Sequence, residues 1–277
     1  MTIFDQKYSH ALQYIIEKGI EEINLRTGHK VKSVPGLHFT FTSESFPLLT
    51  LRRLPIRLFV AEQIWFLSGS RRPKEFVAKF TKAWNDFTNI NQVVSTAYGY
   101  RWRRHFGRDQ IKRLLFLLEH DPSSRQGVVI TWDPSNDGLS PNYIKRNVPC
   151  PVAFTVNIIG GKLHLHSFMR SNDMILGFPH DVAGFALLQR ILAAKLGIPP
   201  GLYSHSISNA HIYDEHYNIA QKLIQRQGQK TEIILQAKVD WFERAERMDE
   251  KLLDEIVDVL NKQYSPNPPI SNIKIVV

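Results

Sequence analysis

A two-glycine turn between two apolar segments constrains the fold more than any other feature of the sequence. Residues 152–159 and 162–168 flank Gly160-Gly161. This pattern predicts a β-hairpin, because glycine accepts the positive φ angles that a tight two-residue turn requires. Cys150 then begins the first strand, and Met169-Arg170-Ser171 lies just past the second.

Helices and further strands alternate irregularly around this hairpin. Apolar spacing predicts helices over residues 5–23, 55–67, 73–87, 110–119, 182–196, 214–225 and 243–263. Short β-rich runs predict strands at residues 38–41, 48–51, 127–132, 202–213 and 232–236. Residues 133–148 are polar and are predicted to form a loop. The order of these elements predicts an α+β fold built on a mixed or antiparallel sheet.

The composition limits the classes of protein that the chain can belong to. With 277 residues, 43% of them hydrophobic, the chain can form one large domain, and it shows neither an internal repeat nor a linker. Its single cysteine excludes an internal disulfide and a cysteine-rich metal site, and we predict no metal. The charged N-terminal region and the interrupted apolar segment 182–198 lead us to expect a soluble, cytoplasmic protein without membrane contact.

The net charge of +9 favours anionic partners. The basic residues are scattered in short clusters, so a nucleic-acid-binding arm is not indicated and nucleic acid is not the expected partner. Small phosphorylated or carboxylated ligands fit this distribution better.

Two features allow both a structural and a functional interpretation. Glu62 lies in the segment PIRLFVAEQIWFL, which is apolar on nearly every side, and a buried carboxylate needs either an ion pair with a neighbouring arginine or a catalytic role. Residues 97–103, AYGYRWR, mix aromatic rings with arginines, as binding loops do. The alternative for this stretch is aromatic–arginine stacking at the rim of the core.

Several motifs, in their order and spacing, resemble the thymidylate synthase superfamily over residues 20–225. They are RTG at Arg26, PLLTLRRLPIRLFVAEQIWFLSG, YGYRWR, DPSSRQ, Pro149-Cys150, MRSND, LGFPHD and AHIY. The resemblance implies a homodimer with a sheet at its interface, and a pyrimidine nucleoside monophosphate that is bound covalently. It also implies 5,10-methylenetetrahydrofolate as the one-carbon donor.

The resemblance assigns chemical roles to four residues. Cys150 corresponds to the nucleophile that adds to pyrimidine C6, and nearby arginines would lower the pKa of its thiol. Glu62 corresponds to a carboxylate that organises water and proton transfers around the ring. Tyr98 belongs near the site of C5 proton removal. Asp181 stands where the base is recognised.

The remaining site residues are assigned to the phosphate, the sugar and the folate. The resemblance makes Arg26, Arg170 and Ser171 phosphate ligands, and Arg125 a phosphate ligand lent by the other subunit, because planar guanidinium groups suit phosphate oxygens. It assigns His211 and Tyr213 to the sugar hydroxyls, and Trp84, Asp173 and Gly177 to the folate side. Gln126 stands where the family usually carries a second arginine, which weakens one expected contact.

Asp181 redirects the predicted reaction, because thymidylate synthases normally carry asparagine there. An amide accepts from uracil N3–H and donates to O4, whereas an ionised carboxylate only accepts. A carboxylate suits the N3–H and N4–H donors of a cytosine that is protonated as the thiolate adds. Met169, in MRSND, is similar to the deoxycytidylate hydroxymethylases, and Pro151 replaces the synthases' usual histidine. The alternative role of Asp181 is the N-cap of the helix over residues 182–196.

We therefore predict folate-dependent C5 hydroxymethylation of a cytosine nucleotide, with dCMP favoured over CMP. One alternative is a methyltransferase of the same superfamily, either a thymidylate synthase or a dCMP methylase. Another is a non-catalytic homologue that binds RNA, although such a protein needs no nucleophile. We expect residues 1–277 to form a single domain in which residues 237–277 diverge from the family, and the apolar end 273–277 could act as a lid.

Overall fold

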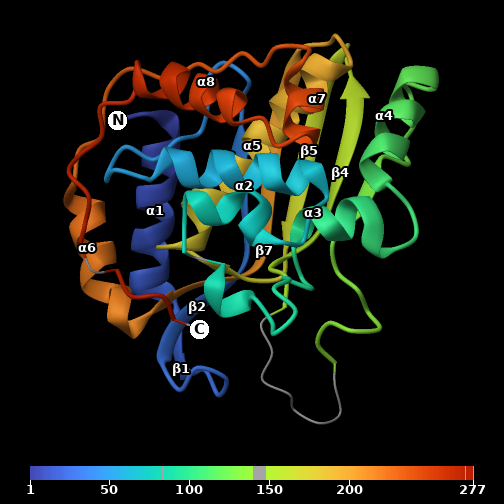
Figure 1. The fold of residues 1–277 in the computed structure, drawn as a ribbon. Helices are drawn as coiled ribbons and strands as arrows, with labels where there is room; N and C mark the ends of the chain where they lie inside the picture. The colour runs from blue at the N-terminus through green and yellow to red at the C-terminus, as the bar shows by residue number, and fades with distance from the viewer. Residues whose placement is uncertain (83, 140–147, 272, 277) are drawn as a thin grey trace.

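The computed structural model describes residues 1–82, 84–139, 148–271 and 273–276. Its centre is a seven-stranded sheet in the order β1-β2-β7-β5-β4-β3, with the short β6 beside β7 (Figure 1). The strands are β1 (Ile20–Ile23), β2 (Lys30–Phe41), β3 (Val128–Ile130), β4 (Pro151–Ile159), β5 (Lys162–Met169), β6 (Asn172–Asp173) and β7 (Pro200–Tyr213). Strands β5 and β6 run parallel to β7, and the other neighbours are antiparallel. The predicted α+β fold with a mixed sheet is confirmed.

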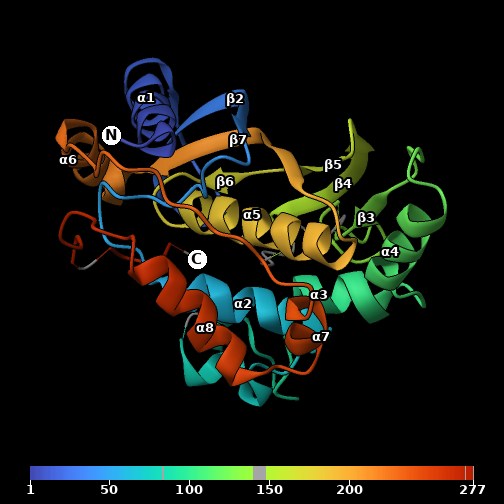
Figure 2. The ribbon, with the colours of Figure 1, turned by 90° about the horizontal axis from the view of Figure 1, so that it is seen from above.

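Helices cover one face of this sheet in successive layers (Figure 2). They are α1 (Ile3–Lys18), α2 (Ile56–Ser68), α3 (Tyr98–Tyr100), α4 (Gln110–His120), α5 (Gly177–Lys195), α6 (Tyr217–Gln225), α7 (Trp241–Glu246) and α8 (Glu250–Asn261). Helix α5 packs on β5 and β7, α2 packs on α5, and α7 and α8 pack on the far side of α2. This enclosure explains why α2 is apolar nearly all round. In the ranges given above, we find no helix that combines the length and the apolar character needed to cross a bilayer.

The opposite face of the sheet exposes apolar side chains. Val128, Ile130, Phe168 and Leu202 are all more than a third exposed. They alternate along β3, β5 and β7 with residues that are buried in the core, so they point away from the helices. His38 and His166 lie on this face too. His38 Nδ1 and His166 Nε2 each contact the Ser206 hydroxyl, at 2.9 and 2.8 Å.

The hairpin prediction is confirmed, and most predicted helices are present. Strands β4 and β5 pair on either side of Gly160-Gly161, both of which have positive φ. The first helix was predicted too long, because Gly19 ends α1 and residues 20–23 form β1. The described part of the helix predicted over residues 73–87 has separate 3₁₀ turns at Pro73–Glu75, Val77–Lys79 and Asn85–Phe87, and Phe76 breaks the first from the second with a non-helical φ of −151°. The helix predicted over residues 243–263 is interrupted between α7 and α8 at Met248, which has a positive φ.

Two predicted strands are wrong because side chains take the place of a strand partner. In residues 48–51, the Thr50 N–H donates to Asp5 Oδ1 at 2.8 Å. In residues 232–236, the Ile234 N–H donates to Gln263 Oε1 at 2.9 Å. Residues 48–51 are fully buried, and residues 232–236 alternate between buried and exposed side chains, so both runs resemble a strand although they pair with no sheet. Residues 140–147 of the predicted loop lie outside the described residues.

The stretch 97–103 is part of the core rim. Arg101 is buried and pairs with Asp133 and Asp137, at 3.3 and 3.0 Å. Trp102 is fully buried and donates its indole N–H to Thr131 Oγ1. Arg101 and Trp102 thus have a structural role at the core rim, although, within the described ranges, Arg101 forms ion pairs and not the stacking contact of the structural alternative.

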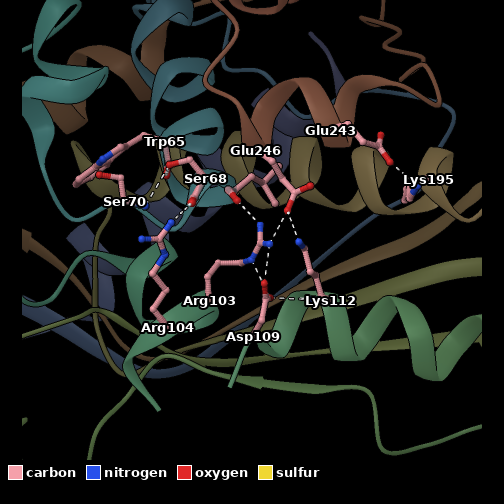
Figure 3. A network of polar contacts seen from close by, with 11 residues as sticks. Trp65, Ser68, Ser70, Arg103, Arg104, Asp109, Lys112, Lys195, Glu243 and Glu246 are labelled. Carbon is pink, nitrogen blue, oxygen red and sulfur yellow. Dashed lines mark hydrogen bonds and ion pairs between the residues drawn. The ribbon is translucent and has the colours of Figure 1, made fainter. Parts of the chain in front are cut away.

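Arg103 joins the π-helical turn Arg101–His105, which follows α3, to three other elements (Figure 3). It is buried and binds the Leu67 carbonyl at the end of α2, both carboxylate oxygens of Asp109 at 2.7 Å, and Glu246 of α7 at 2.6 Å. This single side chain fixes α7 to the turn that follows α3.

We expect Arg103→Leu to lower the free energy of unfolding by about 3–5 kcal/mol, because it leaves Asp109 without its cation and Glu246 with only the longer contact to Lys112, at 3.5 Å. Urea titration of both proteins measures the change. Arg104→Leu is the matched control, since Arg104 is exposed and, among the described residues, hydrogen-bonds only to the Ser68 carbonyl, at 3.4 Å (Figure 3). Equal losses in the two variants would contradict the assigned role of Arg103.

Candidate active site

Cys150 and the Arg170-Ser171 pair lie next to each other because the hairpin sets their register. Pro151 pairs with Met169 across β4 and β5. One step further along, the Arg170 backbone N–H donates to the Cys150 carbonyl at 2.9 Å. The hairpin thus positions the thiol beside two side chains that were predicted to bind phosphate.

The Cys150 thiol is largely enclosed, and burial raises its pKa above the ordinary value. The negative charge of Asp181 acts in the same direction, whereas the Arg170 charge and a hydrogen bond from Ser171 oppose it. The expectation that arginines would lower the pKa of this thiol is therefore right for the contribution of Arg170 and wrong for the net direction. Burial thus favours the neutral form of the thiol.

Asp181 lies inside helix α5 and not at its N-cap. The helix begins at Gly177 with Leu176 as the N-cap residue, so the capping alternative for Asp181 is wrong. Asp181 Oδ2 instead accepts a hydrogen bond from Asn172 Nδ2 at 2.8 Å. Burial, aided by the charge of Asp173, raises the pKa of Asp181 to about 7, and the Asn172 contact works against this rise.

Glu62 projects from α2 toward the same region. Its Oε1 accepts the indole N–H of Trp84 at 2.9 Å. Among the described residues it forms no ion pair, so the predicted pairing with a neighbouring arginine is not found. Burial, together with the charge of Asp181, raises the pKa of Glu62 to about 8, and the Trp84 hydrogen bond lowers it.

Tyr98 completes this group from α3. Burial is the main cause that raises the pKa of its hydroxyl, and the charges of Cys150, Asp181 and Glu62 add to it. A hydrogen bond with the Cys150 backbone opposes this rise. The structure therefore brings Cys150, Glu62, Tyr98 and Asp181 together from four different elements.

Arg170 is held by contacts within the chain. Its Nε and Nη2 donate to the carbonyls of Pro149 and Val148, at 2.9 and 3.0 Å. Its Nη1 donates to the Ser171 hydroxyl at 3.3 Å, and its guanidinium lies over the Trp132 ring. These contacts hold the cation beside the segment that carries the thiol.

His211 and Tyr213 lie at the end of β7, next to Asp173. Asp173 and His211 are partners in the parallel β6–β7 pairing. The rings of His211 and Tyr213 stand edge to face at 5.1 Å, and Arg26 hydrogen-bonds to Tyr213. Burial lowers the pKa of His211, which favours its neutral ring. Arg26 is thus placed near the residues that were predicted to bind the sugar.

A family model described as thymidylate synthase matches residues 6–276. The chain belongs to the thymidylate synthase family. The match extends on both sides of the region 20–225 and includes the C-terminal segment. Membership makes the chain a one-carbon transferase that acts at C5 of a pyrimidine nucleotide, with methylenetetrahydrofolate as co-substrate.

The three residues predicted for the folate side lie beside Glu62 and Asp181. Trp84 offers a partly exposed ring directly beside Glu62. Asp173 Oδ1 accepts the backbone N–H groups of Ile175 and Leu176, at 2.8 and 3.1 Å, and so shapes the turn into α5. A Cβ atom at Gly177 would lie 3.1 Å from Asn172 Nδ2, so the glycine leaves space for the contact between Asn172 and Asp181.

Arg125 is the one predicted ligand that the chain does not bring to the others. It lies between α4 and β3, at the edge of the sheet farthest from β1. Its side chain is exposed and, in the part of the chain that the structure describes, makes no hydrogen bond or ion pair. A second chain would have to supply this residue to a thymidylate synthase site.

The C-terminal segment ends close to the start of α6. His216 Nε2 contacts the Lys274 carbonyl at 2.9 Å, and Lys274 Nζ pairs with Glu215 at 3.0 Å. The last residue of the predicted lid, 277, lies outside the described residues. No cluster of three metal-ligating side chains occurs within the described ranges.

Asn172 and His205 were missed by the sequence analysis. Both are buried polar residues, and they are linked by a hydrogen bond of 3.0 Å. His205 could have been found from alternation along residues 202–213, because it falls in register with the buried Tyr203 and Ile207. A polar residue at such a position needs a partner.

We expect Trp84→Phe to raise the pKa of Glu62 further, because it removes a hydrogen bond to the ionised form and leaves the aromatic ring. The limb of the pH–rate profile that belongs to Glu62 should move upward by about one pH unit. Product formation measured across pH tests this. Trp65→Phe is the matched control, since the buried Trp65 Nε1 has no hydrogen-bond partner among the described residues. If this limb of the pH–rate profile does not move in Trp84→Phe, its assignment to Glu62 is wrong.

Proposed function

We propose that the chain hydroxymethylates C5 of a cytosine nucleotide, with dCMP preferred and CMP as the second candidate. The observation that carries this proposal is Asp181, an aspartate inside α5 whose carboxyl is enclosed with the Cys150 thiol. The pKa of Asp181, about 7, lies close to neutral pH. A carboxyl group of this kind can give a proton to cytosine N3 and then remain as the paired carboxylate.

In the proposed reaction the Cys150 sulfur adds to C6 while N3 takes up the proton, which makes C5 nucleophilic. C5 attacks the methylene carbon of the folate, and one of the two C–N bonds of that carbon breaks. Loss of the C5 proton, with Tyr98 nearby, then breaks the second C–N bond, so that tetrahydrofolate leaves and an exocyclic methylene group remains. Water adds to that group, and the thiolate is expelled with restoration of the double bond. Overall, the reaction consumes the nucleotide, methylenetetrahydrofolate and water, and it forms the hydroxymethyl nucleotide and tetrahydrofolate.

Glu62 is proposed to hold the water and move its proton. A carboxyl whose pKa is about 8 exchanges protons readily near neutral pH. The buried Met169 and Pro151, which depart from the synthase pattern, support the hydroxymethylase branch. Arg26, Arg170 and Ser171 are proposed phosphate ligands, and His211 and Tyr213 proposed sugar ligands.

We also propose a homodimer formed through the open face of the sheet. Exposed Val128, Ile130, Phe168 and Leu202 give this face an apolar character. A second copy would cover it and could supply Arg125, which finds no partner within its own described chain. Sedimentation velocity measures the assembly, and a monomer at micromolar concentration would contradict this part of the proposal.

Product masses decide the function. The protein is incubated with methylenetetrahydrofolate and, separately, with dCMP, CMP, dUMP or UMP. A gain of CH₂O on a cytosine nucleotide without dihydrofolate is expected. A gain of CH₂ with dihydrofolate would identify a methyltransferase, either a thymidylate synthase or a dCMP methylase. No product from any nucleotide would contradict the enzyme proposal and favour a binding role, for instance on RNA.

A further inference from the structure

A continuous set of hydrogen bonds runs from Asp181 into the core of the sheet. Asn172, on β6, donates from Nδ2 to Asp181 Oδ2 at 2.8 Å. Its Oδ1 is 3.0 Å from His205 Nε2, in the middle of β7. Asn172 and His205 are fully enclosed, with 1% and 0% exposure. Neither of them has been given a role so far.

The chemistry of the groups fixes the direction of each hydrogen bond. An ionised Asp181 only accepts, so the Asn172 amide must turn its NH₂ group toward it. The amide oxygen then faces His205, whose Nε2 must carry the proton. Burial lowers the pKa of His205 to about 3, so the ring is neutral and holds one proton only. His205 therefore acts as a donor to Asn172.

The other ring nitrogen of His205 is held by hydroxyl groups. Its Nδ1 lies 2.8 Å from the Tyr203 hydroxyl and 2.9 Å from that of Ser167. Tyr203 and Ser167 are buried as well. Because a neutral Nδ1 accepts when Nε2 carries the proton, these hydroxyls fix the tautomer of the ring. The core of the sheet thus determines which group Asn172 presents to Asp181.

The form of Asp181 decides which bases fit. A carboxylate has two acceptor oxygens, so it suits the N3–H and N4–H donors of protonated cytosine and repels uracil O4. A neutral carboxyl has one donor and one acceptor, and it can pair with either base. Discrimination against uracil therefore requires the ionised form, held with both oxygens toward the base. Oδ2 keeps a second lone pair beyond the Asn172 contact, and Oδ1 has no hydrogen bond among the described residues.

We propose that Asn172 and His205 are positioning residues that orient Asp181 and favour its carboxylate form once the proton has passed to cytosine N3, and that they thereby determine the choice of cytosine over uracil. This inference rests on the proposed function, because it assumes that Asp181 contacts the base. Gly177 supports it, since any side chain there would press on Asn172 Nδ2 at 3.1 Å and on Asp181 Oδ2 at 3.4 Å.

Other titratable groups face Asp181 from the surrounding elements. They are Glu62 of α2, Tyr98 of α3, Cys150 before β4, Asp173 of β6, and Tyr203 and His205 of β7. Glu62 is the one whose pKa, about 8, lies near that of Asp181. Trp84→Phe separates the two, because it moves the ionisation of Glu62 and leaves Asn172 and His205 in place.

The test measures binding of dCMP and dUMP by calorimetry from pH 5.5 to 9. In the wild type, the preference for dCMP should fall as pH decreases through about 7. His205→Phe keeps a ring and removes the donor, so the preference at pH 8 should fall about tenfold and its midpoint should move to higher pH. His205→Gln restores an N–H near the position of Nε2 and should retain most of the preference. Trp84→Phe should move the midpoint much less than His205→Phe does.

Three results would overturn the inference, and the proposed function fails in a different way. A wild-type preference for dCMP that does not change with pH contradicts it without any variant. A folded His205→Phe with unaltered preference and midpoint contradicts it, as does an equal loss in His205→Gln and His205→Phe. If the wild type prefers dUMP at every pH, the proposed function itself is wrong.

Discussion

Cys150→Ser is expected to lower the rate of product formation by about 10⁴-fold or more, the largest effect of any single substitution in this protein. A serine hydroxyl is a far weaker nucleophile toward C6 and a poorer leaving group from it, and removal of a catalytic nucleophile has costs of this order. Rates are measured with saturating nucleotide and methylenetetrahydrofolate. A residual rate within tenfold of the wild type would show that Cys150 is not the nucleophile.

The covalent step can be observed directly because Cys150 is the only cysteine. A 5-fluorocytosine nucleotide should leave a stable adduct in the intact mass of the wild type, since C5 cannot release fluorine as it releases a proton. The serine variant should show no adduct and should still bind the nucleotide with an affinity within a few-fold of the wild type. An adduct in Cys150→Ser would place the nucleophile elsewhere.

Asp181→Asn is expected to change the ratio of dCMP to dUMP turnover by about 100-fold or more in favour of dUMP. The amide accepts from uracil N3–H and donates to O4, whereas it cannot give a proton to cytosine N3. Sites that hydrogen-bond a polar substrate edge discriminate by factors of this size. Both nucleotides compete in one reaction, and the products are separated by mass.

Asp173→Asn is the matched control for charge. Asp173 lies on β6 near Asp181, and its Oδ1 contacts with the backbone of Ile175 and Leu176 can be kept by an amide oxygen. This variant removes a neighbouring negative charge without a change at the base, so at pH 8, where Asp181 is largely ionised in both proteins, it should leave base preference unaltered. If both variants change the ratio of dCMP to dUMP turnover equally, base choice depends on the local negative charge and not on a contact between Asp181 and the base.

Local patterns predicted the parts of the fold that depend on local contacts. The Gly160-Gly161 hairpin, α4 and the end of α2 at Gly69 all follow from turn chemistry and apolar spacing. Residues 48–51 and 232–236 could not be assigned in this way, because their partners are side chains far away in sequence. Asp5 and Gln263 satisfy backbone groups that a neighbouring strand would otherwise satisfy.

The identity of an active-site residue could be predicted where a motif contains it. The protonation state of that residue depends on packing and could not be predicted in the same way. Resemblance identified Cys150, Glu62 and Asp181, and the structure places the three together. The resemblance did not indicate that burial would raise the pKa of the Cys150 thiol by more than the Arg170 charge lowers it. The link from Asp181 through Asn172 to His205 joins separate strands, so neither residue could be paired with the other from spacing alone.

Helix α2 carries Glu62 and is enclosed between α5 on one side and α7 and α8 on the other. Trp241, Leu252 and Leu253, all fully buried, belong to this outer layer. The pKa of Glu62 therefore depends on α7 and α8, which need not contact any ligand. We expect chimeras that exchange residues 241–261 between relatives to have a different optimum pH. This change should occur even where every side chain that contacts a ligand stays the same.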